Sequence, residues 1–207
     1  MAGAFVLCLA KGSSEAAGSE AGASLTGRDA SPDKPTRPDS RDSHSAAQMS
    51  LESVKSWLAA HAPDLPIIEV EGTTATVDTA ALALNVEPGR IAKTLAVRAG
   101  EHLFLLCTRG NARLDNPKCK DEFGDRPRML GPEETLEITG HPIGGVCPFG
   151  LKAPLPIYLD VSLQAFDTVY PAGGSRNTSV EFPTQRLYDL VGERWVDLCK
   201  LPEAGGA

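Results

Sequence analysis

The chain has 207 residues, of which 42% are hydrophobic and 23% charged, and this is the composition of a globular protein with its own core. Its formal charge of −7 argues against binding nucleic acid through the net electrostatic field, so any such contact has to be local. Five cysteines without a CxxC pair argue against a zinc site and suit a reducing, cytoplasmic location, and no apolar run is long enough to cross a bilayer.

Residues 1–48 differ in composition from the rest of the chain. From residue 12 onward they are mostly Ser, Ala, Gly, Asp, Pro and Arg, without apolar periodicity. Such a segment cannot bury enough apolar surface to offset the entropy of ordering it. We therefore expect residues 1–48 to be a disordered extension, residues 49–201 to form one domain, and residues 202–207 to be a loose tail.

The first half of this domain is expected to alternate short helices and strands. Ser50 is expected to cap a helix that ends before Pro63, because apolar residues follow it at helical spacing. The next expected elements are a strand at 66–70, an alanine-rich helix at 78–84 closed by Asn85, and two apolar strands at 91–97 and 103–108. The turn at 99–102 predicts that these two strands form an antiparallel pair.

The second half predicts more short elements. Asn116 followed by Pro117 indicates a helix with Asn116 as its N-cap. The other expected elements are a strand at 128–130, a helix at 132–139, strands at 155–160, 168–171, 179–182 and 195–198, a helical turn at 161–165, and a last helix capped by Thr184. Short strands with helices interspersed irregularly predict a mixed α/β (α+β) fold with a curved, mainly antiparallel mixed sheet.

The stretch of residues 139–152 stands out, because four glycines and two prolines alternate with apolar residues and there is almost no charge. A surface loop is ordinarily polar, since its backbone faces water. Glycine lets the backbone approach a ligand closely, and proline removes freedom that binding would otherwise have to freeze. The composition predicts a rigid loop whose N–H groups can hold a carbonyl or a developing oxyanion. A tight connection without a ligand is the alternative.

Lys93 is the notable charge of the first half, because the residues from Ile91 to Val97 around it are mostly apolar. A lone lysine in such a setting usually reaches water while its stem covers the core. At the mouth of an apolar pocket, the same ammonium would be a point charge for a phosphate or a carbonyl oxygen. The residues alone leave both interpretations open.

Cys147 and His141 lie in the same loop and suggest a thiol nucleophile with its base. Such a pair needs a third, orienting group and a lowered thiol pKa, and Pro148 prevents a helix from beginning directly after Cys147. A small buried thiol that lines a pocket is the simpler interpretation. The sequence contains no G-x-S-x-G elbow, Walker A loop or Rossmann glycine fingerprint.

A modest excess of positive charge between Arg109 and Arg128 is the candidate for a local contact with nucleic acid. Acidic residues such as Asp115 and Asp121 are interspersed in it. A solvated face of mixed charge is the commoner outcome for such a run.

Five short motifs occur in an order that resembles one known family. They are Ile-Ala-Lys-Thr-Leu at 91–95, Arg-Leu-Asp at 113–115, the glycine-rich stretch at 139–150, Leu-Pro-Ile-Tyr at 155–158 and Gly-Gly-Ser-Arg at 173–176. The chain from Met49 to about Lys200 is similar to the YbaK/EbsC, or prolyl-tRNA synthetase-associated, domain. Members of that family are trans-editing hydrolases that remove a wrongly attached amino acid from tRNA without a metal or an organic cofactor.

This resemblance implies roles for particular residues. Lys93 would be the family's key catalytic lysine, and residues 144–148 would be its G-x-x-x-P loop over the aminoacyl ester. It also implies a sheet partly closed into a barrel and flanked by helices, the 3′ end of an aminoacyl-tRNA as substrate, and prolyl-tRNA synthetase as a candidate partner. The substrate-binding residues that it implies are Thr94, Gly144, Gly145, Val146, Cys147, Pro148 and Arg176.

Two departures from the family's pattern leave the substrate amino acid open. Asn177, Thr178 and Ser179 stand where several relatives carry an acidic residue, and Cys147 stands where serine is more usual. The expected function is a deacylase for small misacylated residues, of the Cys or Ala type, on tRNA for proline. The alternatives are a non-catalytic tRNA- or synthetase-binding module of the same fold, and a cysteine hydrolase that rests on Cys147 alone.

Overall fold

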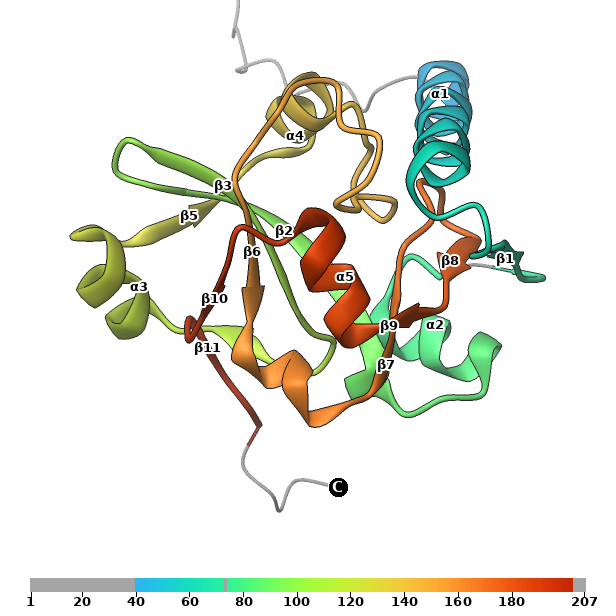
Figure 1. Cartoon of the computed structure of the whole chain (residues 1–207). Coiled ribbons are helices and arrows are strands. Elements are labelled where there is room, and N and C mark those ends of the chain that lie inside the picture. The colour runs from blue at the N-terminus through green and yellow to red at the C-terminus, as the bar shows by residue number, and fades with distance from the viewer. Residues whose placement is uncertain (1–39, 73, 203–207) are drawn as a thin grey trace, which may run out of the picture. The chain divides into compact units, whose positions relative to one another are not determined.

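The computed structural model describes residues 40–72 and 74–202 (Figure 1). Its helices are α1 (Ser40–His61), α2 (Val77–Leu84), α3 (Asn116–Phe123), α4 (Pro132–Thr139) and α5 (Thr184–Val191), with 3-10 helices at Pro88–Arg90 and Val161–Ala165. Its strands are β1 (Ile67–Glu69), β2 (Ile91–Ala99), β3 (His102–Arg109), β4 (Arg113–Leu114), β5 (Pro127–Met129), β6 (Ile157–Asp160), β7 (Thr168–Pro171), β8 (Thr178–Val180), β9 (Phe182–Pro183), β10 (Arg194–Val196) and β11 (Cys199–Lys200).

The main sheet has the strand order β10-β6-β3-β2-β7-β9, and β5 also pairs with β2. The β2–β3 hairpin is antiparallel from Ala92↔Arg109 to Ala99↔His102, as the apolar runs predicted. The sheet is mixed, because β6 and β7 run parallel to their neighbours in the hairpin and β10 runs parallel to β6. The sheet curls into a half-barrel with helices at its flanks (Figure 1), which confirms the predicted fold class.

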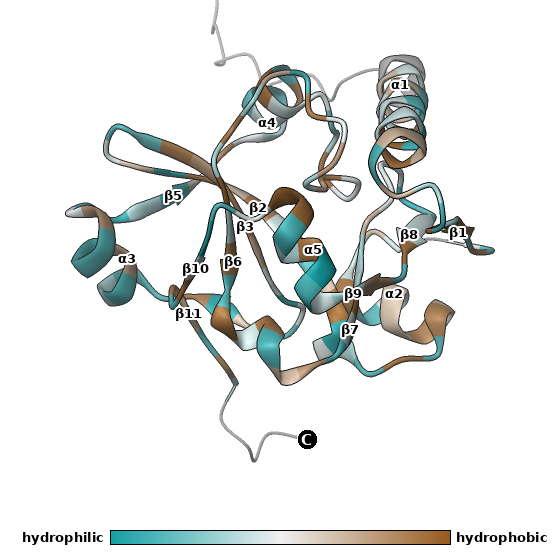
Figure 2. Ribbon diagram, in the orientation of Figure 1, coloured by the Kyte–Doolittle hydropathy of each residue, from teal (hydrophilic) through white to brown (hydrophobic). Residues whose placement is uncertain are grey.

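The sheet separates two apolar clusters, and β3 contributes to both. Leu105 and Cys107 belong to the larger cluster, which also includes buried residues of α1 and α5. Phe104 and Leu106 belong to the smaller cluster on the other side, under α3 and β11. Successive side chains of a strand point to opposite faces, so a strand buried on both faces reads as a continuous apolar run. Figure 2 shows the contrast with α3, which is mostly hydrophilic.

The first helix begins ten residues before the predicted cap, so the expected start at Ser50 is wrong. α1 runs from Ser40, and Ser50 is buried within it. The chain contains no proline or glycine between Pro38 and Pro63, so nothing in that interval breaks a helix. The predicted domain boundary at residue 49 therefore falls inside α1. The extension predicted to be disordered at 1–48 overlaps α1 at residues 40–48, which are helical. Its residues 1–39, and residues 203–207 of the predicted loose tail, lie outside the described part.

Three further local expectations need correction. Asp115, not Asn116, caps α3, and its carboxylate accepts a hydrogen bond from the Lys118 N–H at 3.1 Å. The single strand expected at 179–182 is divided into β8, which pairs with β1, and β9, which pairs with β7. Thr184 is the first residue of α5, not its cap, and its hydroxyl donates to the Phe166 carbonyl. The division of the strand depends on pairing partners that are distant in sequence, and the two cap positions depend on the backbone geometry at single residues.

The predicted C-terminal ends of α2 and α4 are confirmed. Asn85 takes the left-handed conformation, with φ of 54°, at the end of α2, and Gly140 does the same at the end of α4. In the described ranges, no helix has the length and apolar character that a membrane crossing requires.

Candidate functional site

A pocket of about 300 Å³ lies along β2. Its wall includes Lys93 and Thr94 of that strand and Gly144 and Val146 of the glycine-rich loop. The remaining wall comes from the segment that leads into α2, from the residues after β5, and from the region of β7 and β8. The two stretches that the sequence marked as unusual therefore meet in one cavity.

The pocket exists because one edge of β2 is only partly covered. β3 pairs with the whole of one edge. On the other edge, β7 pairs at Ile91 and Ala92, and β5 pairs from Val97 to Ala99. Within the described residues, no strand pairs with Lys93, Thr94 or Leu95 on that side. Part of the pocket is thus lined by a short length of open strand edge.

The ammonium of Lys93 is held by the turn that follows β3. Its Nζ donates to the Gly110 carbonyl oxygen at 2.9 Å and also to the Ala112 carbonyl oxygen. Burial lowers the pKa of Lys93 from its ordinary value of 10.5, and the smaller effects of Cys199, which raises this pKa, and of Arg113, which lowers it, act in opposite directions. An ammonium has three N–H donors, so two are used in positioning and one remains for a ligand.

The carbonyl oxygens that hold Lys93 belong to a turn with little room to move. A Cβ on Gly110 would lie 2.3 Å from the Pro88 carbonyl oxygen and 2.7 Å from a Val77 methyl group. Only glycine fits there without moving backbone. The close packing therefore fixes the position of the Gly110 carbonyl that receives the lysine.

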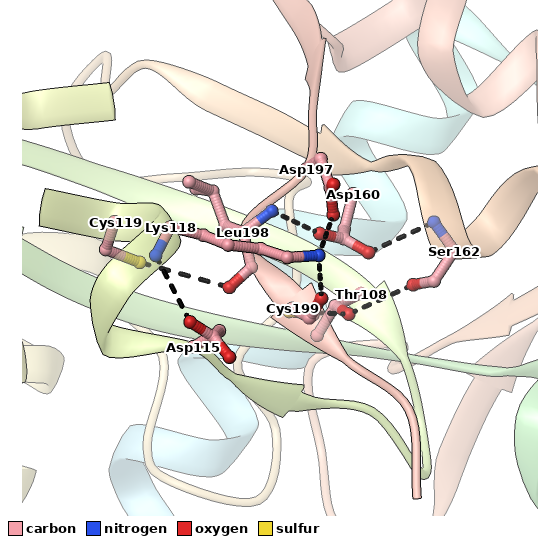
Figure 3. Close-up of polar contacts among 9 residues, drawn as sticks. All are labelled: Thr108, Asp115, Lys118, Cys119, Asp160, Ser162, Asp197, Leu198 and Cys199. Carbon is pink, nitrogen blue, oxygen red and sulfur yellow. Dashed lines mark hydrogen bonds and ion pairs between the residues drawn. The ribbon is translucent and has the colours of Figure 1, made fainter. Parts of the chain in front are cut away.

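The C-terminal segment contacts the residues that flank and follow this turn (Figure 3). The buried Asp160 carboxylate accepts from the Leu198 N–H at 2.9 Å, and the Leu198 carbonyl accepts from the Asp115 N–H at 2.8 Å. The Lys118 ammonium donates to the Cys199 carbonyl at 2.8 Å. β11 then pairs with β4, which directly follows the turn. These contacts tie the end of the domain to the residues that orient Lys93.

The glycine-rich loop packs tightly against the chain after β7. Gly144 has a φ of +91°, which favours glycine, and Arg176 packs against it, with its Cγ and Nε 3.4 Å from the position of a Cβ. A Cβ on Gly145 would lie 2.9 Å from the Gly174 carbonyl oxygen. The Gly145 N–H is already used, because it donates to the Pro142 carbonyl at 2.9 Å. The loop therefore approaches the pocket in one rigid conformation.

His141 is fully buried and is neutral at ordinary pH, because burial lowers its pKa. Its Nε2 lies 2.8 Å from the Phe149 carbonyl oxygen, and its Nδ1 lies 2.5 Å from the Ser50 hydroxyl. A carbonyl can only accept, so Nε2 carries the proton and Nδ1 accepts from Ser50. His141 joins the loop to α1 and has no free acceptor for a thiol proton.

Cys147 belongs to the glycine-rich loop, but its side chain is fully buried and does not line the pocket. The expectation of a thiol that lines the pocket is therefore not met. Its Sγ is 3.8 Å from His141 Nε2 and 3.7 Å from the Phe149 carbonyl oxygen. Burial raises the pKa of the Cys147 thiol to about 12. A thiolate is the reactive form of cysteine, so this environment argues against a cysteine nucleophile.

Residues 71–190, which include these pocket residues, match the aminoacyl-tRNA editing domain family. The chain belongs to that family. It is 44% identical to the uncharacterised protein YwhH of Bacillus subtilis (strain 168) over 154 residues, which cover 73% of this chain and 98% of YwhH. It is 26% identical to EbsC of Enterococcus faecalis, a proposed Cys-tRNA(Pro)/Cys-tRNA(Cys) deacylase, over 59% of this chain and 76% of that protein.

The structure of this editing domain also resembles solved structures. One is a crystal structure of a proposed trans-editing enzyme for prolyl-tRNA synthetase, with a TM-score of 0.68 and 34% sequence identity. The similarity covers 73% of this chain and 97% of that one. The resemblance read from the five sequence motifs is thereby confirmed at the level of the family.

The pocket of the editing domain brings together only part of the predicted set of site residues. Lys93, Thr94, Gly144 and Val146 are in its wall. The predicted residues that lie outside the wall are Gly145, Cys147, Pro148 and Arg176. Gly145 and Arg176 nevertheless support the loop through the contacts described above.

Sequence reasoning missed one polar side of the pocket. Thr74 lies in the wall, and its hydroxyl oxygen is buried without a hydrogen-bond partner among the described residues. Its N–H donates to the Arg176 carbonyl, which joins this segment to the chain after β7. The threonines that follow Gly72 in the sequence were the available signal for a polar wall. Nothing in the sequence indicated that Thr74 lies in the same pocket as Lys93, about 20 residues further along.

The basic stretch between Arg109 and Arg128 is for the most part a face of mixed charge. The Lys118 ammonium pairs with the Asp197 carboxylate, and the Arg128 guanidinium pairs with Glu134 at 3.2 Å. Arg113 is exposed and lies opposite Lys200 in the β4–β11 ladder. The broad interpretation as a solvated surface therefore fits most of this stretch.

Proposed function

We propose that this editing domain is a trans-acting deacylase that hydrolyses the ester of a small amino acid, of the Cys or Ala type, wrongly attached to tRNA(Pro). The observation that carries the proposal is the convergence of the fixed Lys93 ammonium with Gly144 and Val146 of the glycine-rich loop on one pocket of about 300 Å³. The Cys-tRNA(Pro) deacylase activity proposed for EbsC, and the trans-editing role proposed for the structural relative, favour the same substrate class. Prolyl-tRNA synthetase is the proposed partner.

The proposed reaction needs no protein nucleophile. An aminoacyl ester is already activated, so a water oxygen can attack its carbonyl carbon and place negative charge on the carbonyl oxygen. The remaining N–H of Lys93 and the backbone N–H groups of Gly144 and Val146 would stabilise that charge. The bond from carbon to the ribose oxygen then breaks, the ribose oxygen takes up the proton that the attacking water loses, and free amino acid and tRNA are released. The buried, protonated Cys147 has no role in these steps.

Selectivity in this proposal comes from size. Ala96, Ala172 and Val146 are among the small apolar residues of the wall. In such a pocket, one methylene is worth only about 1–3 kcal/mol, so neighbouring small residues are discriminated by roughly 10- to 200-fold. We expect Ala and Cys esters to be accepted together, with different rates.

The test is single-turnover hydrolysis of a panel of charged tRNAs, including Ala-tRNA(Pro), Cys-tRNA(Pro), Pro-tRNA(Pro) and one ester of a large residue. The expected result is release of Ala or Cys at least about 100-fold faster than in buffer, with slower release of the large residue. The Lys93→Ala variant serves as the matched inactive protein. Binding of tRNA without hydrolysis of any ester would replace this proposal with a non-catalytic module.

A further inference from the structure

The open edge of β2 presents backbone hydrogen-bonding groups to the pocket. The Ala96 carbonyl oxygen accepts from the Leu130 N–H at 3.0 Å, so the backbone groups of Ala96 point away from β3. Leu105, which is opposite Ala96, donates its N–H to the Pro156 carbonyl at 2.9 Å and therefore also points away from the hairpin. These two bonds fix which residues of β2 face the partly covered edge.

Thr94 comes two residues before Ala96 and has the same orientation. In an antiparallel pair, the N–H and the C=O of one residue point to the same side, and this side alternates along the strand. Thr94 thus directs both groups to the edge between β7 and β5, inside the pocket wall. Among residues 40–72 and 74–202, no backbone partner is found for Thr94 on that edge.

We propose that the aminoacyl group binds to this edge as a strand of a single residue. Its α-ammonium donates to the Thr94 carbonyl, and its ester carbonyl oxygen accepts from the Thr94 N–H in addition to the donors named in the proposed reaction. A hydrogen-bonded antiparallel pair exchanges both bonds between two residues, so one amino acid is enough to complete it. This inference rests on the proposed function and specifies how the same site recognises an α-amino acid.

The chemistry of the pocket wall favours this arrangement. None of the described residues that line it is an aspartate or a glutamate, so among them the α-ammonium finds no carboxylate. A backbone carbonyl is then the acceptor suited to a positive charge, and an uncovered strand edge is otherwise a liability for a protein. The open edge of β2 at Thr94 and the neighbouring Lys93 line the same pocket.

The pairing also predicts the direction of the substrate's side chain. Directly opposite residues of a ladder place their side chains on the same face of the sheet. Thr94 lies between Ala92 and Ala96 on the face of the larger apolar cluster, which includes Leu130 and has Val146 packed against it. The substrate side chain would therefore enter this region, where Leu130 and Val146 limit its size.

The first test uses stable analogues and does not depend on catalysis. The probes are 3′-amino-3′-deoxyadenosine carrying alanine, and the same nucleoside carrying propionic acid, which lacks only the α-ammonium. Hydrogen bonds to charged groups predict that the alanyl probe binds about 10- to 100-fold more tightly and shifts the amide resonance of Thr94. Equal affinities, or binding that leaves the Thr94 amide resonance unchanged, would overturn the inference. Absence of ester hydrolysis by the same protein would count against the proposed function alone.

The second test compares two substitutions at one position. Thr94→Pro and Thr94→Val both remove the hydroxyl, but only proline removes the N–H and fills the edge with its ring. The N–H of Thr94 points away from β3, so the hairpin ladder is expected to tolerate the proline. We expect Thr94→Pro to deacylate at least about 10-fold more slowly than Thr94→Val. Equal rates with equal thermal melts would contradict the proposal, and if Thr94→Pro does not fold, the analogue test decides.

Discussion

Lys93 and Gly110 are joined by a hydrogen bond of 2.9 Å from the lysine ammonium to the glycine carbonyl oxygen. The bond crosses from the first half of β2 to the turn after β3, and the Ala112 carbonyl in the same turn accepts a second bond. A long, flexible side chain is thereby held at one position beside the pocket. A charge that is fixed before the substrate arrives stabilises a transition state without reorganisation.

Replacing Lys93 should therefore reduce catalysis much more than stability. Lys93→Ala is expected to lower the single-turnover rate by about 10²–10³-fold, and Lys93→Arg should not restore it fully, because a planar guanidinium does not match a compact ammonium. The exposed Lys120 offers a control, and Lys120→Ala should hydrolyse at the wild-type rate. Thermal melts confirm that each variant folds. A folded Lys93→Ala protein with wild-type activity would refute the electrostatic role.

The contact between the glycine-rich loop and the chain after β7 should be sensitive to a single methyl group. In Gly145→Ala, the new Cβ would lie 2.9 Å from the Gly174 carbonyl oxygen. The nearest atoms are all backbone atoms of Gly174 and Ser175, which cannot move aside as a flexible side chain can. We expect a stability loss of about 1–3 kcal/mol and at least a 10-fold slower deacylation, because the loop has to shift. Gly131→Ala is the control, since no heavy atom of the described residues would lie within 4 Å of its Cβ. Denaturant unfolding and single-turnover rates measure the two effects, and equal behaviour of the two variants would contradict the argument.

Cys147 should be important for packing and not for chemistry. Cys147→Ser places a hydroxyl in a fully buried position, which is expected to cost about 1–3 kcal/mol of stability. Deacylation should stay within a few-fold of the wild-type rate at temperatures where the variant is folded. Intact-mass spectrometry during turnover should detect no acyl-enzyme. A trapped thioester on Cys147, with loss of activity in the serine variant, would restore the cysteine-hydrolase alternative.

His141 should make the domain less stable as the solution becomes acidic. Burial lowers its pKa below the ordinary 6.5, so below that pH the unfolded chain binds a proton that the folded chain does not. The free energy of unfolding should then fall with decreasing pH, by up to about 1.4 kcal/mol per pH unit for this one group. Thermal or urea unfolding between about pH 7.5 and 5.5 measures the slope.

The matched variants for this pH dependence are His141→Gln and His102→Gln. His141→Gln should have lower stability at neutral pH and lack this part of the acid slope, whereas the exposed His102→Gln should keep it. An acid slope in His141→Gln equal to that of the wild type would show that another group causes the loss.

The sequence by itself determined the features that depend on neighbouring residues. Asn85 and Gly140 end their helices as expected, because the left-handed conformation at a C-cap is decided within one turn. The β2–β3 hairpin was predictable because a short turn joins two apolar runs. The family could be identified from five ordered motifs, since residues 91–95 and 139–150 carry chemistry that is written locally.

Only the tertiary structure decided how these stretches form a site. The acceptors of Lys93 lie 17 and 19 residues further along the chain, in a turn whose position depends on packing against Pro88. The open edge at Thr94 exists because β7 and β5 each cover a different end of β2, and such coverage depends on partners that local patterns do not specify. Cys147 is adjacent to pocket-lining residues in sequence and yet buried beneath them, because the fold of the loop determines which face each of its residues presents.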